Sequence, residues 1–331
     1  MKKTLIFLII TAIMLLAGCA QADVKQQPET EAVAEETAAS QTTINETIIN
    51  EMTESTSVAA SQPAAGPTEE NEDAVKEVNV GDLENVFGFA DESGKKLITV
   101  PGENNNTPAD PQEFNVAVGN NGEIVGIKFV KRQEANSQDT LRQTTYNFDN
   151  MAGAIYEAVD GEFIPNRTYM LSRASVLNED VLIKLISTRN TEAEGGSFKK
   201  ADAETIGKIE AVKNRKVVES SLISETEDGA KICLFVFERK GDDMLASIAY
   251  IKDDQVVLKD YPAKYDEQST WRVDAGGQPG LFEVLFLANS NEGLLLALTW
   301  AGPEGENEFV LKDVNGTFQD TGLKSGRYWA P

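Results

Sequence analysis

Short apolar runs separated by turn residues fill the chain from residue 79 onward. Two pairs of runs are clear: "NVFGFA" and "KLITV" flank the turn "DESGK", and "EFNVAV" and "EIVGIKFVKR" flank "GNNG". Apolar runs joined by short stretches of Gly, Asn, Asp and Ser are typical of β-hairpins. The pattern therefore predicts two hairpins in this first part of the chain.

A third pair of runs, "GAIYEAV" and "EFIPNRTYML", has two interpretations. The Asp-Gly pair at 160–161 separates the runs, and such a pair favours a type I′ turn because both positions take a positive φ. The alternative is a helix capped by Asp149, in which Met151, Ile155 and Val159 recur at every fourth position. We favour the hairpin, and we interpret the "VLIKLIST" that follows as one more strand.

One helix is predicted near the middle of this region, over residues 202–215 ("DAETIGKIEAVKNR"). Ile206, Ile209 and Val212 recur near the helical period, so they would share one face. Acidic residues begin the segment and basic residues end it, which is the order that the helix dipole favours.

A second series of strands follows the helix, with turns at "EDG", "KGDD", "KDD", "SNEG" and "NG". In "KICLFVFE" and "LFEVLFLA" both faces of the strand are apolar, which predicts central strands that are covered on both sides. The predicted strands are Val217–Ser224, Lys231–Arg239, Leu245–Ile251, Val256–Asp260, Leu281–Ala288, Leu294–Trp300, Glu308–Lys312 and Thr317–Asp320.

These elements predict a mainly β fold, α+β at the margin, in which hairpins form a sandwich, a barrel or a partial propeller around one clear helix. The folded part spans residues 79–331, enough for one large core or two small ones. Two β-rich halves, at about 79–200 and 201–331, and one continuous β-structure are both compatible with the pattern.

The N-terminus has a different pattern, with Lys2 and Lys3 ahead of an apolar run from Leu5 to Leu16. This run is shorter than the roughly 20 residues that span a bilayer as a helix, and a charged start with a short apolar core is typical of an export signal. The ending Leu16-Ala17-Gly18-Cys19 resembles the lipobox of bacterial lipoproteins. The resemblance implies that residues 1–18 are a signal peptide, cut before Cys19, and that a diacylglyceryl group on the Cys19 sulfur anchors the chain in the cell membrane with its domain on the extracytoplasmic side.

Residues 19–78 are rich in Glu, Ala, Thr, Ser and Gln, and no aromatic residue occurs between Phe7 and Phe87. Such a segment buries too little apolar surface to offset the entropy of ordering, so we expect a disordered tether. The tether carries 13 acidic residues against two lysines, and the folded part has a net charge of −15. A chain this acidic is not expected to bind nucleic acid, which requires clustered Lys and Arg.

The chain contains no histidine, which excludes Ser-His-Asp and Cys-His catalysis and imidazole metal ligands. With Cys19 lipidated, Cys233 has no partner for a disulfide or a thiolate metal site, and we expect it to be a buried strand residue. The paired carboxylates at Asp242–Asp243 and Asp253–Asp254 fall at hairpin turns, where Asp is common. We therefore expect no metal, no cofactor and no catalytic residues.

A long irregular stretch, "DYPAKYDEQSTWRVDAGGQPG", is the best candidate for binding. Loops of this length in compact domains are often functional, and exposed aromatic residues beside a guanidinium can anchor a partner. The candidate ligand-binding residues are Tyr261, Tyr265, Trp271 and Arg272.

Together these features predict a membrane-anchored lipoprotein whose domain is a non-enzymatic binding or interaction module of the cell envelope. An envelope protein or a glycan is the expected partner. The alternatives are a carboxylate-dependent hydrolase of envelope or sugar polymers and a structural accessory subunit. Two carboxyl groups about 5–10 Å apart in a cleft would favour the hydrolase, and exposed aromatic residues on one face would favour binding.

Overall fold

The computed structural model describes residues 76–100, 108–190, 197–267, 282–302 and 304–329. The predicted signal peptide, Cys19, nearly all of the tether, Trp271 and Arg272 lie outside the described residues. Order begins before Asn79, because Val78 is buried and its N–H donates to the carbonyl of Asn289 at 2.9 Å. Within the described part of the chain, no helix is both long enough and apolar enough to cross a membrane.

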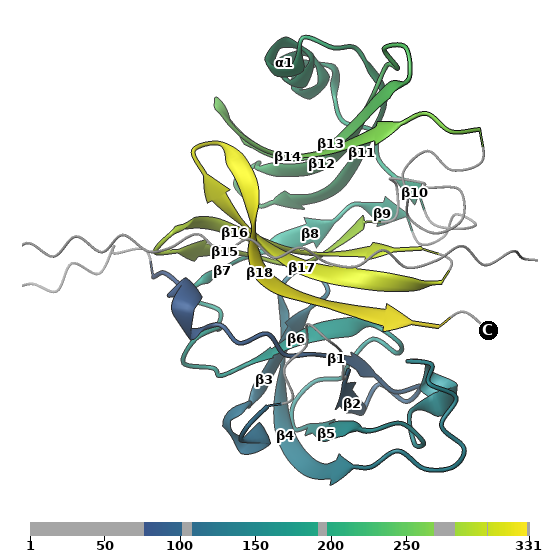
Figure 1. Cartoon of the computed structure of the whole chain (residues 1–331). Helices are drawn as coiled ribbons and strands as arrows, with labels where there is room; N and C mark the ends of the chain where they lie inside the picture. Colours follow the sequence, from purple (N-terminus) through teal and green to yellow (C-terminus); the bar gives the residue numbers. More distant parts are fainter. Residues whose placement is uncertain (1–75, 101–107, 191–196, 268–281, 303, 330–331) are drawn as a thin grey trace, which may run out of the picture. The chain divides into compact units, whose positions relative to one another are not determined.

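The first six strands close into an antiparallel barrel with the order β1-β2-β5-β4-β3-β6 (Figure 1). The two hairpins predicted here are confirmed: Phe89 of β1 lies opposite Ile98 of β2, and Ala117 of β3 lies opposite Val125 of β4. The strands are β1 (Phe87–Ala90), β2 (Lys96–Thr99), β3 (Val116–Gly119), β4 (Glu123–Gln133), β5 (Gly153–Ala158) and β6 (Thr168–Ser172). Short 3-10 helices η1 (Val80–Asp82), η2 (Pro111–Glu113) and η3 (Thr145–Asn147) lie in the connections.

The predicted hairpin across 160–161 is wrong, although both of its strands exist. β5 pairs with β2 and β4, whereas β6 pairs with β1 and β3, so the two strands lie apart in the barrel. The helical alternative is also wrong, since Ile155 lies within β5. Asp160 does not form a tight turn: its carboxylate accepts a hydrogen bond from the Gly126 N–H at 2.6 Å, and the longer connection buries Phe163 in the barrel core.

Ten of the remaining strands form one sheet with the order β7-β15-β16-β17-β18-β14-β13-β12-β11-β8. The predicted strand "VLIKLIST" is split at Lys184 into β7 and β8, which pair with opposite ends of this order. The strands are β7 (Leu182–Ile183), β8 (Leu185–Ser187), β11 (Val217–Thr226), β12 (Lys231–Phe237), β13 (Asp243–Lys252), β14 (Gln255–Lys264), β15 (Phe282–Ser290), β16 (Gly293–Ala301), β17 (Gly305–Val314) and β18 (Thr317–Tyr328). A separate two-stranded sheet joins β9 (Arg189–Asn190) and β10 (Ser197–Phe198).

The two halves of the large sheet pack face to face around one core. Ile232, Leu234 and Ile248 from β12 and β13 share a buried cluster with Leu296 and Leu298 from β16. The described strands therefore form a closed barrel and a sheet folded onto itself as in a sandwich, which confirms the mainly β prediction.

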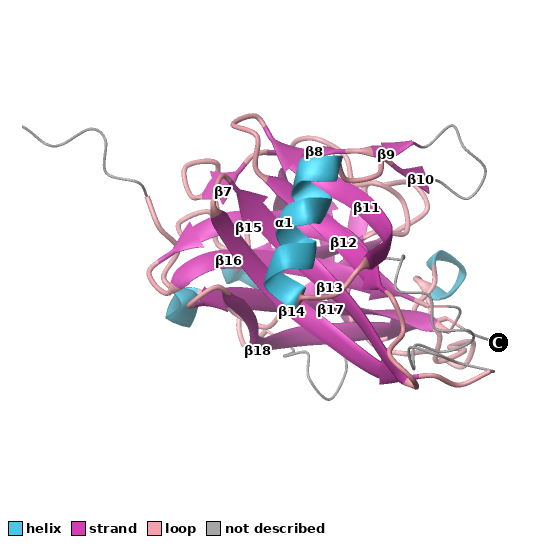
Figure 2. Ribbon diagram, turned by 90° about the horizontal axis from the view of Figure 1, so that it is seen from above, coloured by secondary structure: helices cyan, strands magenta, loops and turns pink. Residues whose placement is uncertain are grey.

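The predicted helix is confirmed as α1 (Ala203–Lys213), which lies over the outer face of β11–β14 (Figure 2). The Asp202 carboxylate caps its first turn by accepting a hydrogen bond from the Thr205 N–H at 2.8 Å. The helix ends at Asn214, whose φ of 47° is left-handed. Ile209 packs in one buried cluster with Cys233, so the outer face of β12 is covered.

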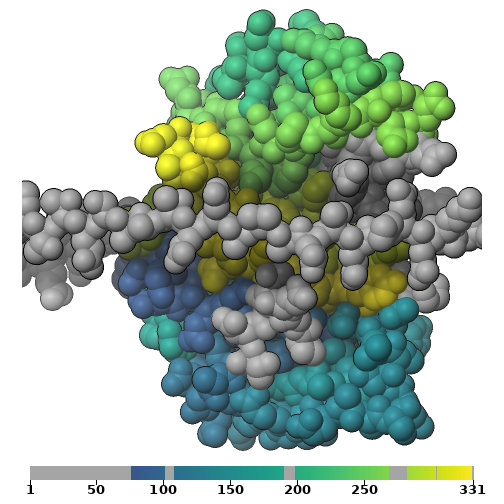
Figure 3. Space-filling model, in the orientation of Figure 1, coloured from purple at the N-terminus to yellow at the C-terminus, as the bar shows by residue number. Residues whose placement is uncertain are grey.

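β15–β17 are covered on both faces, as the sequence predicts for "LFEVLFLA". Val284 and Leu287 face the core of the large sheet, while Leu285 and Phe286 join a cluster that includes Phe87 from the barrel. Figure 3 shows the same order on the surface, with the yellow C-terminal strands between the teal barrel and the green strands.

Candidate functional site

The large sheet is weakly joined between β14 and β18. These strands are parallel neighbours and pair only at Leu258 and Thr317. A register shift in β18 follows, because Phe309 pairs with Lys324 whereas Leu311 pairs with Asp320. The interruption leaves a partly open pocket of about 480 Å³, which we call the seam pocket.

The seam pocket takes its walls from three strands. β14 supplies two residues, and β17 and β18 supply the others on either side of the register shift. The lining residues are Lys259, Tyr261, Asn307, Glu308, Phe309, Val310, Asp320, Gly322, Leu323, Lys324 and Ser325.

Three residues that line the pocket carry buried polar atoms without a hydrogen-bond partner. These atoms are the Tyr261 hydroxyl, both carboxyl oxygens of Glu308 and the Ser325 hydroxyl. In the described part of the chain only five residues have such atoms, and the other two are Trp300 and Arg327. A buried polar group left unpaired costs about 1–3 kcal/mol, and native proteins contain few of them. Three of the five such residues in the described part of the chain therefore line one pocket.

Glu308 is 1% exposed, and its environment favours the uncharged carboxyl. Burial raises the pKa of Glu308 well above its ordinary value, and the neighbouring Glu306 raises it further, against the opposing effect of Arg327. An uncharged carboxyl both donates and accepts a hydrogen bond. An uncharged Glu308 can share its proton with the neighbouring Glu306 carboxylate, and its remaining acceptor positions carry no charge.

An aromatic cluster lies beside the pocket and includes Tyr261. The Tyr261 ring centroid is 5.3 Å from those of Phe282 and Trp300, which stack at 4.8 Å from each other. Burial raises the pKa of Tyr261, so the hydroxyl keeps its proton and remains a donor. At the pocket's rim the Lys259 ammonium lies 2.7 Å from the Asp320 carboxylate, so these two charges balance.

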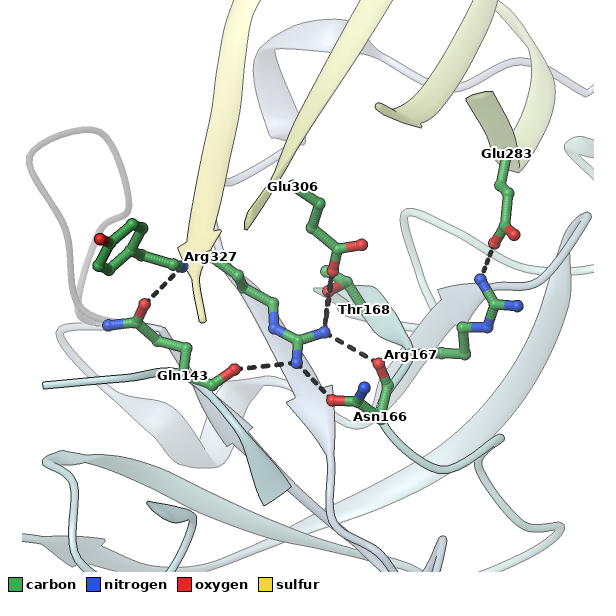
Figure 4. Close-up of polar contacts among 8 residues, drawn as sticks. Gln143, Asn166, Arg167, Thr168, Glu283, Glu306 and Arg327 are labelled. Carbon is green, nitrogen blue, oxygen red and sulfur yellow. Dashed lines mark hydrogen bonds and ion pairs between the residues drawn. The ribbon is translucent and has the colours of Figure 1, made fainter. Parts of the chain in front are cut away.

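A buried arginine on β18 holds the strands of this site against the barrel (Figure 4). The Arg327 guanidinium donates to the Glu306 carboxylate at 2.8 Å and to the Asn166 carbonyl and side-chain oxygens at 2.9 and 2.7 Å. It also donates to the Gln143 carbonyl at 3.0 Å, and the Thr168 hydroxyl donates to Glu306 at 2.5 Å. Glu306 precedes Glu308 by two positions, so the two carboxyl groups lie on the same side of β17.

The residues predicted for binding do not form one exposed surface. β14 runs four residues beyond its predicted end and pairs Tyr261 with Ala246, so the Tyr261 ring packs against the core of the large sheet, and the residue lines the seam pocket. Tyr265 is 43% exposed, with the Arg239 guanidinium 3.9 Å from its ring centroid, and does not line the pocket. Trp271 and Arg272 lie outside the described residues.

The sequence did not predict Glu308 and Ser325 as site residues. Glu308 begins a predicted strand, and Ser325 lies beyond the predicted end of the last one. The two residues pair directly across β17 and β18, since β18 continues to Tyr328. A prediction that the final strand continues past Asp320 would have paired these two residues. The sequence "FQDTGLKSGRY" does not alternate regularly enough to support that prediction.

The acidic residues here do not form an open hydrolytic site. Glu306 and Glu308 lie two positions apart on β17, but the Glu306 carboxylate is ion-paired with Arg327 and accepts a hydrogen bond from Thr168. Glycoside hydrolysis requires two carboxyl groups that are free to act on the substrate, and here Glu306 is already engaged. Burial raises the pKa of Cys233 to about 12, so its thiol is no nucleophile near neutral pH, and the described residues contain no cluster of three metal-ligating side chains.

Comparison with known proteins identified no matching family model, no matching curated protein and no matching solved structure.

Proposed function

We propose that this chain is a lipid-anchored, extracytoplasmic binding protein, and that its seam pocket takes a small, uncharged ligand rich in hydroxyl groups, such as a sugar unit of an envelope glycan. The observation that carries the proposal is the set of unpaired polar atoms on Tyr261, Glu308 and Ser325, which line one pocket.

The chemistry of these groups defines the ligand class. The Tyr261 hydroxyl, the uncharged Glu308 carboxyl and the Ser325 hydroxyl can each donate and accept, as can each hydroxyl of a sugar. A charged ligand fits less well, because the rim charges on Lys259 and Asp320 balance each other and an unpaired charge is costly to bury. The pocket volume of about 480 Å³ lies within the range of small-molecule sites.

The binding test uses the full-length protein with D-glucose, N-acetylglucosamine and the charged sugar glucuronate as probes, followed by titration calorimetry. We expect an uncharged sugar to bind and glucuronate to bind more weakly. Tyr261→Phe should lower the affinity about 2- to 13-fold, the value of one hydrogen bond. Tyr261→Phe should not lower stability, because the hydroxyl has no partner to lose.

Tyr265→Phe is the matched control, since that exposed tyrosine lies outside the pocket. Equal affinities for native protein and Tyr261→Phe would refute the site, and the absence of binding by both uncharged sugars would refute the ligand class. A larger loss from Tyr265→Phe than from Tyr261→Phe would favour the loop predicted from the sequence.

The anchor has its own test in Cys19→Ser, because the thioether to the lipid requires a thiol. We expect this variant to leave the membrane fraction and to lose incorporation of labelled fatty acid, since two or more acyl chains provide the stable attachment. Retention of the variant in the membrane fraction would refute the lipid anchor without bearing on the seam pocket.

A further inference from the structure

A second pocket lies where the barrel meets the large sheet, and it has the opposite electrostatic character. Its volume is about 340 Å³, and it contains two arginines. We call it the arginine pocket; its polar lining includes Arg167, Arg189, Glu283, Asn121 and Ser224.

Two guanidinium groups share one carboxylate in this pocket. Arg167 donates to one oxygen of Glu283 and Arg189 donates to the other (Figure 4 shows the Arg167 contact). Each guanidinium carries five N–H donors, and Glu283 is the only acceptor that either side chain contacts among the described residues. Among the described residues, the local balance is therefore one uncompensated positive charge, within a chain whose net charge is strongly negative.

The other acidic group near Arg167 does not remove this excess. Glu306 lies close enough to favour the charged form of Arg167, but its carboxylate is already ion-paired with Arg327. Among the described residues no other acceptor takes the remaining N–H groups of Arg167 and Arg189, which we therefore regard as available to a second anion.

The pocket also has an apolar side and a fixed floor. The apolar side consists of Phe198, Ile164, Ile223 and Val284. The ring centroid of Phe198 lies 5.9 Å from the guanidinium carbon of Arg189. The floor includes Asn121, whose N–H donates to the Val284 carbonyl at 2.9 Å and whose side-chain oxygen accepts from the Ser224 hydroxyl at 2.6 Å. The barrel turn is therefore anchored to the sheet before any ligand arrives.

We infer that the arginine pocket binds a small monocarboxylate with an apolar body. A planar carboxylate matches the parallel N–H groups of a guanidinium, and one negative charge balances the single excess positive charge. A phosphate dianion would overcompensate that charge, and an uncharged ligand would leave it unbalanced. This site is separate from the seam pocket, and the inference does not depend on the proposed function.

The experiment titrates the full-length protein with benzoate, with its uncharged analogue benzamide and with inorganic phosphate, followed by NMR or calorimetry. We expect benzoate to bind about tenfold more tightly than benzamide, and Arg189→Gln to remove most of that difference. Arg239→Gln, at an arginine outside both pockets, is the matched control and should leave benzoate affinity unchanged.

Glu283→Gln separates a binding role from a structural one. If the arginines hold a ligand, removing the competing carboxylate raises the local charge, and benzoate affinity should increase about three- to tenfold. An unchanged or lower affinity in folded Glu283→Gln would overturn the inference, as would equal binding of benzoate and benzamide.

Tighter binding of phosphate than of benzoate would overturn the monocarboxylate assignment. If Arg189→Gln does not fold, Arg189→Lys keeps the charge without the planar fork and should still lower benzoate affinity. Tyr261→Phe should bind benzoate normally, so failure at one pocket remains distinguishable from failure at the other.

Discussion

Replacing Arg327 by methionine tests how the barrel is held against the large sheet. Arg327 is 3% exposed and donates hydrogen bonds to the Glu306 carboxylate, to the backbone and side-chain oxygens of Asn166 and to the Gln143 carbonyl. Its guanidinium also lies 4.1 Å from the ring centroid of Phe89. Methionine keeps much of the apolar stem but leaves the Glu306 carboxylate without its cation.

Removing one partner of a buried ion pair costs about 3–5 kcal/mol, because the other charge stays buried and uncompensated. We expect Arg327→Met to lower the free energy of unfolding by about that amount. Adding Glu306→Gln removes the stranded charge, so the double variant should recover about 2 kcal/mol of the loss. The recovery distinguishes an uncompensated charge from a simple loss of packing.

Urea denaturation followed by tryptophan fluorescence measures these free energies. Arg239→Met is the control, because Arg239 is exposed and loses only its contact with the Tyr265 ring. This substitution should lower the free energy of unfolding by no more than about 1 kcal/mol. A loss below about 1 kcal/mol in Arg327→Met would refute the claim that this arginine holds the two parts together. An additional loss from Glu306→Gln in the Arg327→Met background would refute the account of the charge.

Three further outcomes follow from individual side chains. Burial raises the pKa of Glu308 above its ordinary 4.5, so the unfolded chain releases this proton first; the stability of the native protein should fall, relative to Glu308→Gln, as the pH rises above 4.5. Because burial raises the pKa of Cys233 to about 12, iodoacetamide near pH 8 should label the Cys19→Ser variant in urea but not in its native state. Asp202→Ala should lower the free energy of unfolding by about 1–2 kcal/mol, because the cap of α1 and the ion pair with Lys231 are lost together.

Local signals in the sequence predicted most of the strands. At Asn315-Gly316 the residues have φ of 55° and 81°, as the Asn-Gly pair predicts, and β17 and β18 continue on either side. The helix of residues 203–213 likewise followed from its apolar period and from the order of its acidic and basic residues. Where the residues that determine a turn or a helix lie within a few positions of that element, the sequence is sufficient to predict it.

Pairing over longer distances was not predictable in the same way. The Asp-Gly pair at 160–161 has the composition of a tight turn, yet barrel closure places β2 and β4 beside β5, and β1 and β3 beside β6. Closing a barrel satisfies the hydrogen bonds of every edge strand, and that gain exceeds the preference of one dipeptide. The candidate site was not predictable for a related reason: Glu308 pairs with Ser325, and both are buried in a strand arrangement that the local sequence pattern does not specify.

The two proposed pockets share a structural origin in interruptions of the sheet's pairing. The arginine pocket lies at register shifts in β11 and β15, and the seam pocket lies at the shift in β18. Such bulges redirect side chains and occur often beside functional sites.

A bulge alone would leave unpaired backbone groups, but here the exposed backbone is already bonded. The Val284 and Leu285 carbonyls accept hydrogen bonds from the barrel turn at Asn121 and Gly122, and the Val310 carbonyl accepts one from the Thr321 hydroxyl at 2.8 Å. The unpaired atoms at the seam pocket therefore belong to side chains. A strand irregularity does not by itself require these side chains to be buried. Burying a tyrosine, a glutamate and a serine without partners lowers stability at each position, and a ligand would offset that cost only at the groups that it reaches.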